Sequence, residues 1–348
     1  MNNISGGRFA AVLLAGAALI LIVTYVSLTN GIFDMSVKDV IDTLLRIQPQ
    51  ADHDLVIFEF RLPRIVIAIL VGMGLGIAGA VIQSITRNGL ADPGILGINA
   101  GAGAAMVIFM FFFQGQIKGT GLLSIMAMPL FGLLGGLLAA ALIYLFAWKD
   151  GRLEPQRLLL TGIAAGSGLS AVSLFLTLKM NPNDFEMAAV WSSGSIYNAN
   201  WKYIASIIPW LLLLLPVIIR KSYIMDIFQL REESVISVGV SSEKEKAVLL
   251  LCSIGIVSAC VSVSGGIGFI GLMAPHISRR LVGTAHRRIL PVCGIIGALL
   301  VLVSDYIGRT VFAPAELPAG IVTAIIGVPY FMMLLYRGRK KTRLDRYL

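Results

Sequence analysis

Residues 61–85 read RLPRIVIAILVGMGLGIAGAVIQSI, and this stretch decides the class of fold. No charged residue lies between Arg64 and Arg87, so the run is long enough to cross a ~30 Å hydrocarbon core as an α-helix. Glycine recurs along it, and Gly72 and Gly76 have the spacing that lets two membrane helices approach closely. The stretch predicts a membrane-spanning helix that packs tightly against its neighbours.

Similar apolar runs recur along the 348 residues, of which 57% are hydrophobic and 14% charged. A soluble chain carries about 25% charged residues, and a soluble domain of this length could not bury so much apolar surface. We expect an all-α integral membrane protein in which residues 1–348 form a single transmembrane domain. Its ten predicted spans are residues 9–28, 65–85, 94–113, 122–147, 158–178, 204–219, 247–264, 267–278, 289–307 and 319–336.

The eighth predicted span, 267–278, is too short to cross a flat bilayer alone, because a helix rises 1.5 Å per residue. We expect its ends to be buried by protein or to reach an aqueous cavity.

The charges of the connecting segments predict the orientation. With the N-terminus in the cytoplasm, 20 of the 28 lysines and arginines fall in cytoplasmic segments and 8 fall outside. Cytoplasmic segments of membrane proteins carry such an excess of basic residues. We therefore expect a multi-pass protein of the plasma membrane with both termini in the cytoplasm. The net charge of +9 therefore reflects the basic segments that border the membrane lipid. Nucleic acid is not an expected partner.

Two connections on the predicted outer face carry helical patterns of their own. Residues 34–47 place apolar side chains at helical spacing, and Asp34 or Ser36 is the expected N-cap. Residues 181–201 have the composition of a short helix with tryptophans at the membrane interface.

The longest predicted cytoplasmic connection is 221–246. Its pattern predicts a short helix that carries Glu232 and Glu233 and ends at Gly239. A helix–glycine–helix element parallel to the membrane suits docking into a groove on a soluble partner, and a merely solvated loop is the alternative that the residues leave open.

Motifs for catalysis and for cofactor binding are absent from the sequence. No Gly-x-x-x-x-Gly-Lys-Ser/Thr phosphate loop occurs, and His53, His276 and His286 are scattered over three regions. The three cysteines have neither metal-ligand nor disulfide spacing. We expect a chain that is not an enzyme and that binds neither a metal nor a cofactor itself.

Ionisable residues are scarce within the predicted spans. Asp305 is the clearest, and Arg309, four residues later on the same helix, is its expected partner. A proton- or sodium-driven carrier normally shows more such groups, nearer the membrane midplane. An ion-driven secondary transporter is therefore the less favoured alternative.

Several motifs, taken in order, resemble those of the FecCD family, the membrane subunits of ATP-binding-cassette (ABC) importers for iron–siderophore complexes, haem and cobalamin. The resemblance covers almost the whole chain, with Gly89 standing where the family often has proline. The motifs are Arg61-Leu-Pro-Arg64, Gly79-Ala-Val-Ile-Gln83, Ala91-Asp-Pro-Gly94, Leu158-Leu-Leu-Thr-Gly162, Gly266-Ile-Gly-Phe-Ile-Gly-Leu-Met-Ala-Pro-His276 and Glu316-Leu-Pro-Ala-Gly320.

The resemblance implies the type II importer permease fold of the cobalamin permeases, with ten spans in each chain. It implies a second permease chain, either a copy or a sister, around a central pathway. It also implies two copies of an ABC ATPase, which hold ATP and magnesium, and an extracytoplasmic substrate-binding protein. The implied cargo is an iron–siderophore complex, with cobalamin and haem as alternatives.

The resemblance also assigns roles to individual residues. Arg61, Arg64 and Arg309 match the family's arginines that pair with glutamates of the binding protein. The family's ATPase-coupling loop falls on Leu230, Glu232, Glu233, Gly239 and Val240. The inner gate of the family falls on Pro155 and Gln156.

Overall fold

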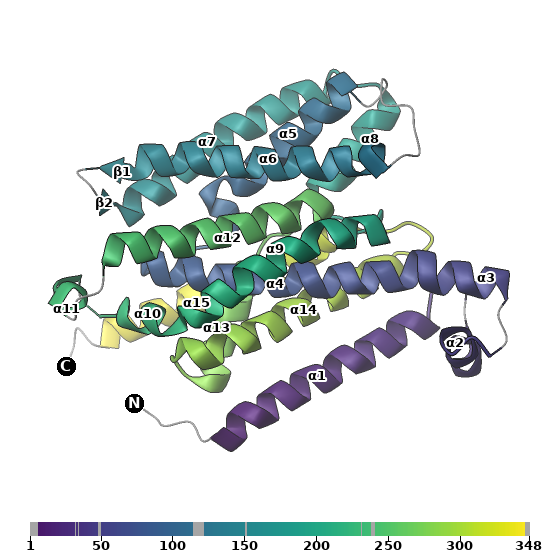
Figure 1. Cartoon of the computed structure of the whole chain (residues 1–348), viewed down its shortest axis with the longest axis horizontal. Helices are drawn as coiled ribbons and strands as arrows, with labels where there is room; N and C mark the ends of the chain where they lie inside the picture. The colour runs from purple at the N-terminus through teal and green to yellow at the C-terminus, as the bar shows by residue number, and fades with distance from the viewer. Residues whose placement is uncertain are drawn as a thin grey trace.

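The computed structural model describes residues 6–31, 33, 35–47, 50–113, 122–149, 152–230, 232–237 and 241–344. These residues are almost entirely helical, as Figure 1 shows, and this confirms the predicted all-α class. The strands that they contain, β1 (Trp148–Lys149) and β2 (Arg152–Leu153), pair as an antiparallel hairpin.

A helix covers each of the ten predicted spans. Eight of the described helical segments are long and apolar enough to cross a membrane, whereas α5, with 16 residues, and α13, with 13, are shorter. The passage of all ten through a bilayer stays a prediction. The ten helices are α1 (Gly6–Thr29), α4 (Leu62–Thr86), α5 (Ile98–Phe113), α6 (Leu122–Ala147), α7 (Pro155–Thr177), α9 (Trp201–Arg220), α12 (Ser242–Ser264), α13 (Ile270–Val282), α14 (His286–Thr310) and α15 (Ala319–Leu344).

Several helix boundaries differ from the prediction by a few residues, and two of the differences change the course of the helix. The helix predicted from residue 65 continues a helical segment that begins with α3 (Ala51–Asp54) and the π-helix η1 (Leu55–Arg61). The helix predicted from residue 94 is interrupted, because the 3₁₀-helix η2 (Pro93–Leu96) ends at Gly97 with a left-handed φ of 73°. Glycine adopts this conformation without the steric cost that a Cβ atom adds.

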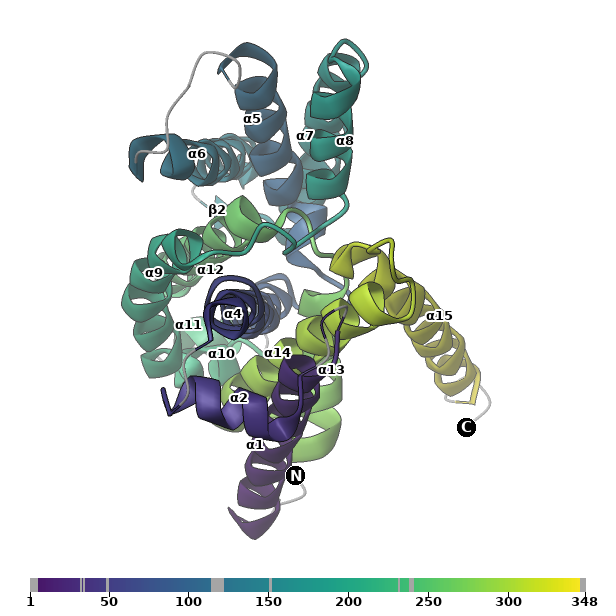
Figure 2. The same cartoon turned by 90° about the vertical axis from the view of Figure 1, so that its right-hand side faces the viewer.

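The helix α4 lies at the centre of the molecule, as Figure 2 shows in a view along it. It packs against α9, α12, α13 and α14, while the group formed by α5, α6, α7 and α8 (Pro182–Ser192) lies to one side. From residue 74 to residue 86 every side chain of α4 is buried. A helix that is apolar all round is expected to be enclosed in this way.

Glycine allows α4 to approach its neighbours backbone to backbone. A Cβ atom on Gly72 would lie 2.2 Å from the Gly297 carbonyl oxygen of α14. One on Gly79 would lie 2.1 Å from the Gly271 carbonyl oxygen of α13. The small-residue spacing seen in the sequence therefore marks real helix–helix contacts.

The two ends of the bundle carry different elements. Figure 1 shows that α1 begins and α15 ends at one end, together with the β-hairpin, α10 (Ser222–Ile227) and α11 (Glu232–Ser237). We call this the terminal end. The helices α2 (Val37–Leu44), α3 and α8 lie at the opposite end. The separation agrees with the predicted alternation of the spans. That the terminal end faces the cytoplasm stays a prediction.

Two short helices form where the sequence analysis expects them. Ser36 caps α2 in a capping box with Asp39, while the other expected cap, Asp34, lies outside the described residues. Asn181 caps α8 through the backbone N–H of Asp184.

The close approach of α4 to α13 predicts that Gly79→Ala destabilises the protein. The added methyl group meets backbone atoms, which cannot rotate away, and overpacking of this kind costs about 1–3 kcal/mol. We expect the melting temperature of the detergent-purified protein to fall by several degrees. Gly168→Ala on α7 is the matched control, because no atom lies within 4 Å of its added Cβ, and equal melting temperatures for the two variants would contradict the packing argument.

Candidate functional site

The fold brings together the three arginines that were predicted to dock a binding protein. Arg61 ends η1, Arg64 lies in the first turn of α4, and Arg309 lies in the last turn of α14. All three line one cavity of roughly 650 Å³ at the opposite end, with Asp305 and Glu316 also in its wall. We call these five residues the arginine cluster.

Arg64 is neutralised within its own chain. Its Nε donates to both carboxylate oxygens of Asp305, at 2.9 and 3.0 Å, and its Nη1 lies 2.8 Å from Glu316 Oε2. The side chains of Arg64 and Asp305 are 14% and 4% exposed, so the pair is shielded from water. Planar pairing of this kind fixes geometry as well as charge.

The main partner of Asp305 therefore differs from the one expected from sequence. Arg309 Nε lies 3.9 Å from Asp305 Oδ2, whereas Arg64 approaches the same carboxylate within hydrogen-bond distance. A spacing of four residues on one helix is visible in a sequence, while a contact between α4 and α14 is not.

The other two arginines bind the end of α1. Arg61 donates to the backbone carbonyls of Leu28 and Phe33, and Arg309 Nη2 donates to the carbonyl of Ser27 at 2.9 Å. The last carbonyls of a helix lack intrahelical partners and attract cations. The arginine cluster thus clamps α1, α4 and α14 together, and its role in docking stays a prediction.

The predicted coupling residues lie at the terminal end. Leu230 follows α10 and is 48% exposed, and Glu232 and Glu233 begin α11 as the sequence pattern predicts. Gly239 and Val240 lie outside the described residues.

A polar chain that the sequence analysis missed anchors α10 to the bundle. Asp226 Oδ1 accepts from the backbone N–H of His286 at 2.8 Å and lies 2.7 Å from Nδ1 of the same residue. His286 Nε2 lies 2.6 Å from Ser84 Oγ on α4, and Arg87 Nε donates to the Phe228 carbonyl at 2.9 Å. We call Ser84, His286 and Asp226 the histidine anchor. In sequence its members are far apart, so no spacing pattern could have joined them.

The predicted gate residues begin α7. Pro155 occupies the first turn, where its missing N–H costs nothing, and Gln156 is exposed. The helix α7 packs against α5 and α6, and within it only Leu158, Gly162 and Gly166 are buried. The remaining length of α7 presents a largely exposed face.

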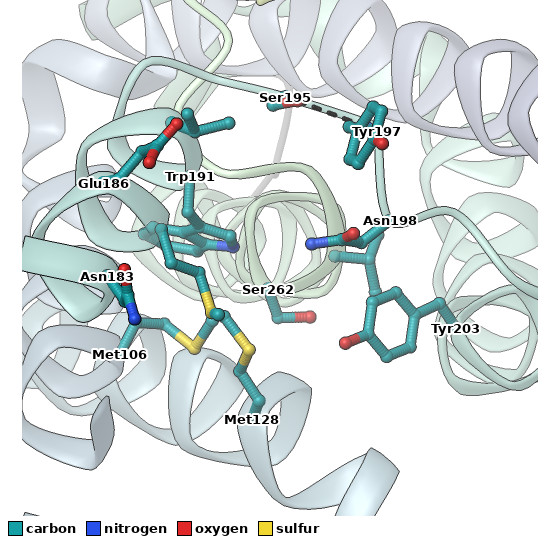
Figure 3. A pocket seen from close by; sticks show the side chains of 13 residues that line it. Met106, Met128, Asn183, Glu186, Trp191, Ser195, Tyr197, Asn198, Tyr203 and Ser262 are labelled. Carbon is teal, nitrogen blue, oxygen red and sulfur yellow. Dashed lines mark hydrogen bonds between the residues drawn. The ribbon is translucent and has the colours of Figure 1, made fainter. Parts of the chain in front are cut away.

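A second cavity, of roughly 330 Å³, lies beside the arginine cluster, and the two share Tyr197 and Asn198 in their walls. Figure 3 shows Met106 and Met128 facing Trp191 across it, with polar side chains around the rim. No sequence pattern predicted this cavity. Among the residues that the structure describes, no group of three or more His, Cys, Asp or Glu side chains could hold a metal ion.

Comparison with known proteins gives consistent matches over nearly the whole chain. The sequence profile of the FecCD transport family matches residues 19–337. The chain is 56% identical to the iron-uptake system permease protein FeuC of Bacillus subtilis (strain 168), over 93% of this chain and 96% of that protein. It is 44% identical to the iron(3+)-hydroxamate import system permease protein FhuG of the same organism, over 92% and 94% of the two chains.

A solved structure agrees with these matches. It shows an inward-facing conformation of a transporter assigned to the metal-chelate type of ABC transporters. The TM-score is 0.79 at 30% identity, and the similarity covers 94% of this chain and 99% of that one.

The buried pairing in the arginine cluster predicts a large effect for Arg64→Gln. The change leaves the buried carboxylate of Asp305 without its main cation, and breaking a buried pair costs about 3–5 kcal/mol. We expect the double variant Arg64→Gln/Asp305→Asn to recover part of this loss in thermal unfolding. Arg46→Gln breaks an exposed pair, worth about 0–1 kcal/mol, and an Arg64→Gln variant as stable as this control would refute the assignment.

The histidine anchor predicts that His286→Ala loosens α10. Loss of the imidazole removes the contacts to Asp226 and Ser84, so we expect faster amide hydrogen exchange across residues 222–230 than in the unmodified protein. His53→Ala at the opposite end is the control and should leave that segment unchanged. Equal exchange of the segment in both variants would show that the anchor does not hold α10.

Proposed function

The chain belongs to the FecCD transport family, and on that premise we propose that it is the membrane-spanning permease subunit of an ABC importer that carries iron–siderophore complexes across the plasma membrane. Its fold is that of a type II ABC importer permease. The single observation that supports an iron–siderophore cargo is the identity of 56%, over nearly the full length of both chains, with an iron-uptake permease.

The distribution of ionisable groups supports a carrier that takes its energy from outside the chain. Asp305, the clearest ionisable residue in the predicted spans, is held by Arg64 and contributes to a structural clamp. A proton- or sodium-driven carrier needs such a group free to bind and release its ion. The sequence contains no phosphate-binding loop, so the proposed ATP hydrolysis takes place on separate ATPase subunits.

We further propose that the two ends of the bundle meet different partners. In the assembly of two permease chains, two copies of the ATPase dock at the terminal ends, at Leu230 and α11 of this chain. The arginine cluster at the opposite end receives acidic side chains of an extracytoplasmic binding protein. Since Arg64 is already paired within the chain, the incoming carboxylates join an existing network and contribute orientation more than affinity.

The remaining partner in the proposed assembly is a second permease chain. The helix α7 packs against α5 and α6 and leaves Leu160 and Phe175 more than half exposed. A pathway between two chains, lined in part by α7, explains a helix that its own bundle covers so little. The second chain is either a copy of this one or a sister permease.

Reconstitution tests the proposed function. We expect the tagged chain, purified gently from its native membrane, to bring with it a P-loop ATPase. In proteoliposomes with the cognate binding protein, this complex should take up a radiolabelled ferric siderophore only when ATP is present inside.

The matched control carries an ATPase whose P-loop lysine is replaced by alanine, and it should show no uptake. Uptake that follows an ion gradient without ATP would refute the ABC assignment. ATP-driven uptake of cobalamin or haem without uptake of ferric chelates would refute the cargo.

A further inference from the structure

A single carboxylate joins the segment after the predicted coupling loop to the segment before the predicted gate. Glu243 lies in the first turn of α12, and its Oε2 accepts from the backbone N–H of Leu153 at 2.8 Å. Leu153 belongs to β2 and is 3% exposed, so this backbone donor has no easy access to water. An unsatisfied buried N–H is costly, which makes the bond to Glu243 a firm one.

A buried lysine holds this carboxylate in place. Lys246 Nζ, one helical turn further along α12, donates to Glu243 Oε1 at 2.8 Å. The Lys246 side chain is 7% exposed and that of Glu243 is 26% exposed. Because the ion pair occupies Oε1, Oε2 is aimed at the hairpin, and a hydrogen bond to a charged acceptor is about twice as strong as a neutral one.

The geometry around this contact differs on its two sides. On one side, α12 packs along its length against α4, α6 and α9, and α10 is fixed by the histidine anchor. On the other side, α7 packs against α5 and α6 but buries only Leu158, Gly162 and Gly166. The hairpin lies directly before the first turn of α7, so a displacement of β2 acts on the start of this helix.

We infer that Glu243 is the positioning residue through which movement of the coupling segment reaches the start of α7, at Pro155 and Gln156. The inference rests on the proposed function, in which the ATPase docks at Leu230 and α11, and it adds that ATP binding to the docked ATPase displaces α11. The displaced chain continues directly into the first turn of α12. Glu243 then pulls β2, and β2 moves the first turn of α7, since only Glu154 lies between Leu153 and Pro155.

The test compares Glu243→Ala with Glu245→Ala in the complete complex of permease, ATPase and binding protein. Glu245 lies on the same turn of α12, and its side chain is similarly exposed, at 23%, but it pairs with Lys221 rather than with the hairpin. We expect Glu243→Ala to lower the amount of ferric siderophore imported per ATP hydrolysed at least tenfold, with ATP hydrolysis retained. The Glu245→Ala complex should stay within twofold of the unmodified complex.

A second readout follows the motion itself. Cysteines introduced at Leu230 and at Gln156 are labelled with a water-soluble thiol reagent on the complex in detergent solution, with and without trapped nucleotide. The native cysteines Cys252, Cys260 and Cys293 are buried, so their background is low. In the unmodified complex we expect nucleotide to change the labelling rate at both positions. With Glu243→Ala the change should persist at Leu230→Cys and disappear at Gln156→Cys.

Separate outcomes overturn the inference and its premise. Coupling in Glu243→Ala equal to that in Glu245→Ala, or a nucleotide response that persists at Gln156→Cys, overturns the role of Glu243 alone. Failure of the unmodified complex to import ferric chelates with ATP overturns the proposed function. If Glu243→Ala does not assemble, Lys246→Met removes the cation that aims the carboxylate, and unchanged coupling in that variant overturns the inference.

Discussion

The contact between α4 and its neighbours is the constraint on which the rest of the structure depends. Gly72 and Gly79 bring the backbone of α4 against the backbones of α14 and α13, at distances that exclude a single methyl group. Because lipid is as apolar as the side chains, helix association in a membrane depends on such close packing rather than on the hydrophobic effect. The rest of the bundle is arranged around this rigid axis.

The helix α4 also connects the terminal end of the molecule with the opposite end. At its start Arg64 binds Asp305 of α14, and at its end Ser84 contacts His286, the first residue of α14. The two helices are therefore joined by polar contacts at both ends and by glycine packing between them. In the proposed transport cycle this pair forms the part that stays fixed, and α7, in which only three residues are buried, forms the part that moves.

The predicted docking arginines have a structural role of their own. Arg61 and Arg309 hold the end of α1 through backbone carbonyls, so their side chains already contribute to stability before any partner docks. A loss of transport after their replacement has two physical explanations, a less stable protein or the loss of docking. The melting temperature of the variant separates them, because only the first lowers it. The histidine anchor and Glu243, to which the family resemblance assigns no role, also connect the terminal end to the bundle.

The sequence by itself determined the class of fold, the approximate positions of ten helices, the cap of one short helix and the family. These features follow from local patterns, because apolar length, glycine spacing and capping residues act within a few turns of one helix. Only the tertiary structure decided that Asp305 pairs with Arg64, that His286 contacts Asp226 and Ser84, and that Glu243 accepts a hydrogen bond from the hairpin. Each of these contacts joins residues far apart along the chain, and their meeting depends on how closely the glycine-faced helices pack.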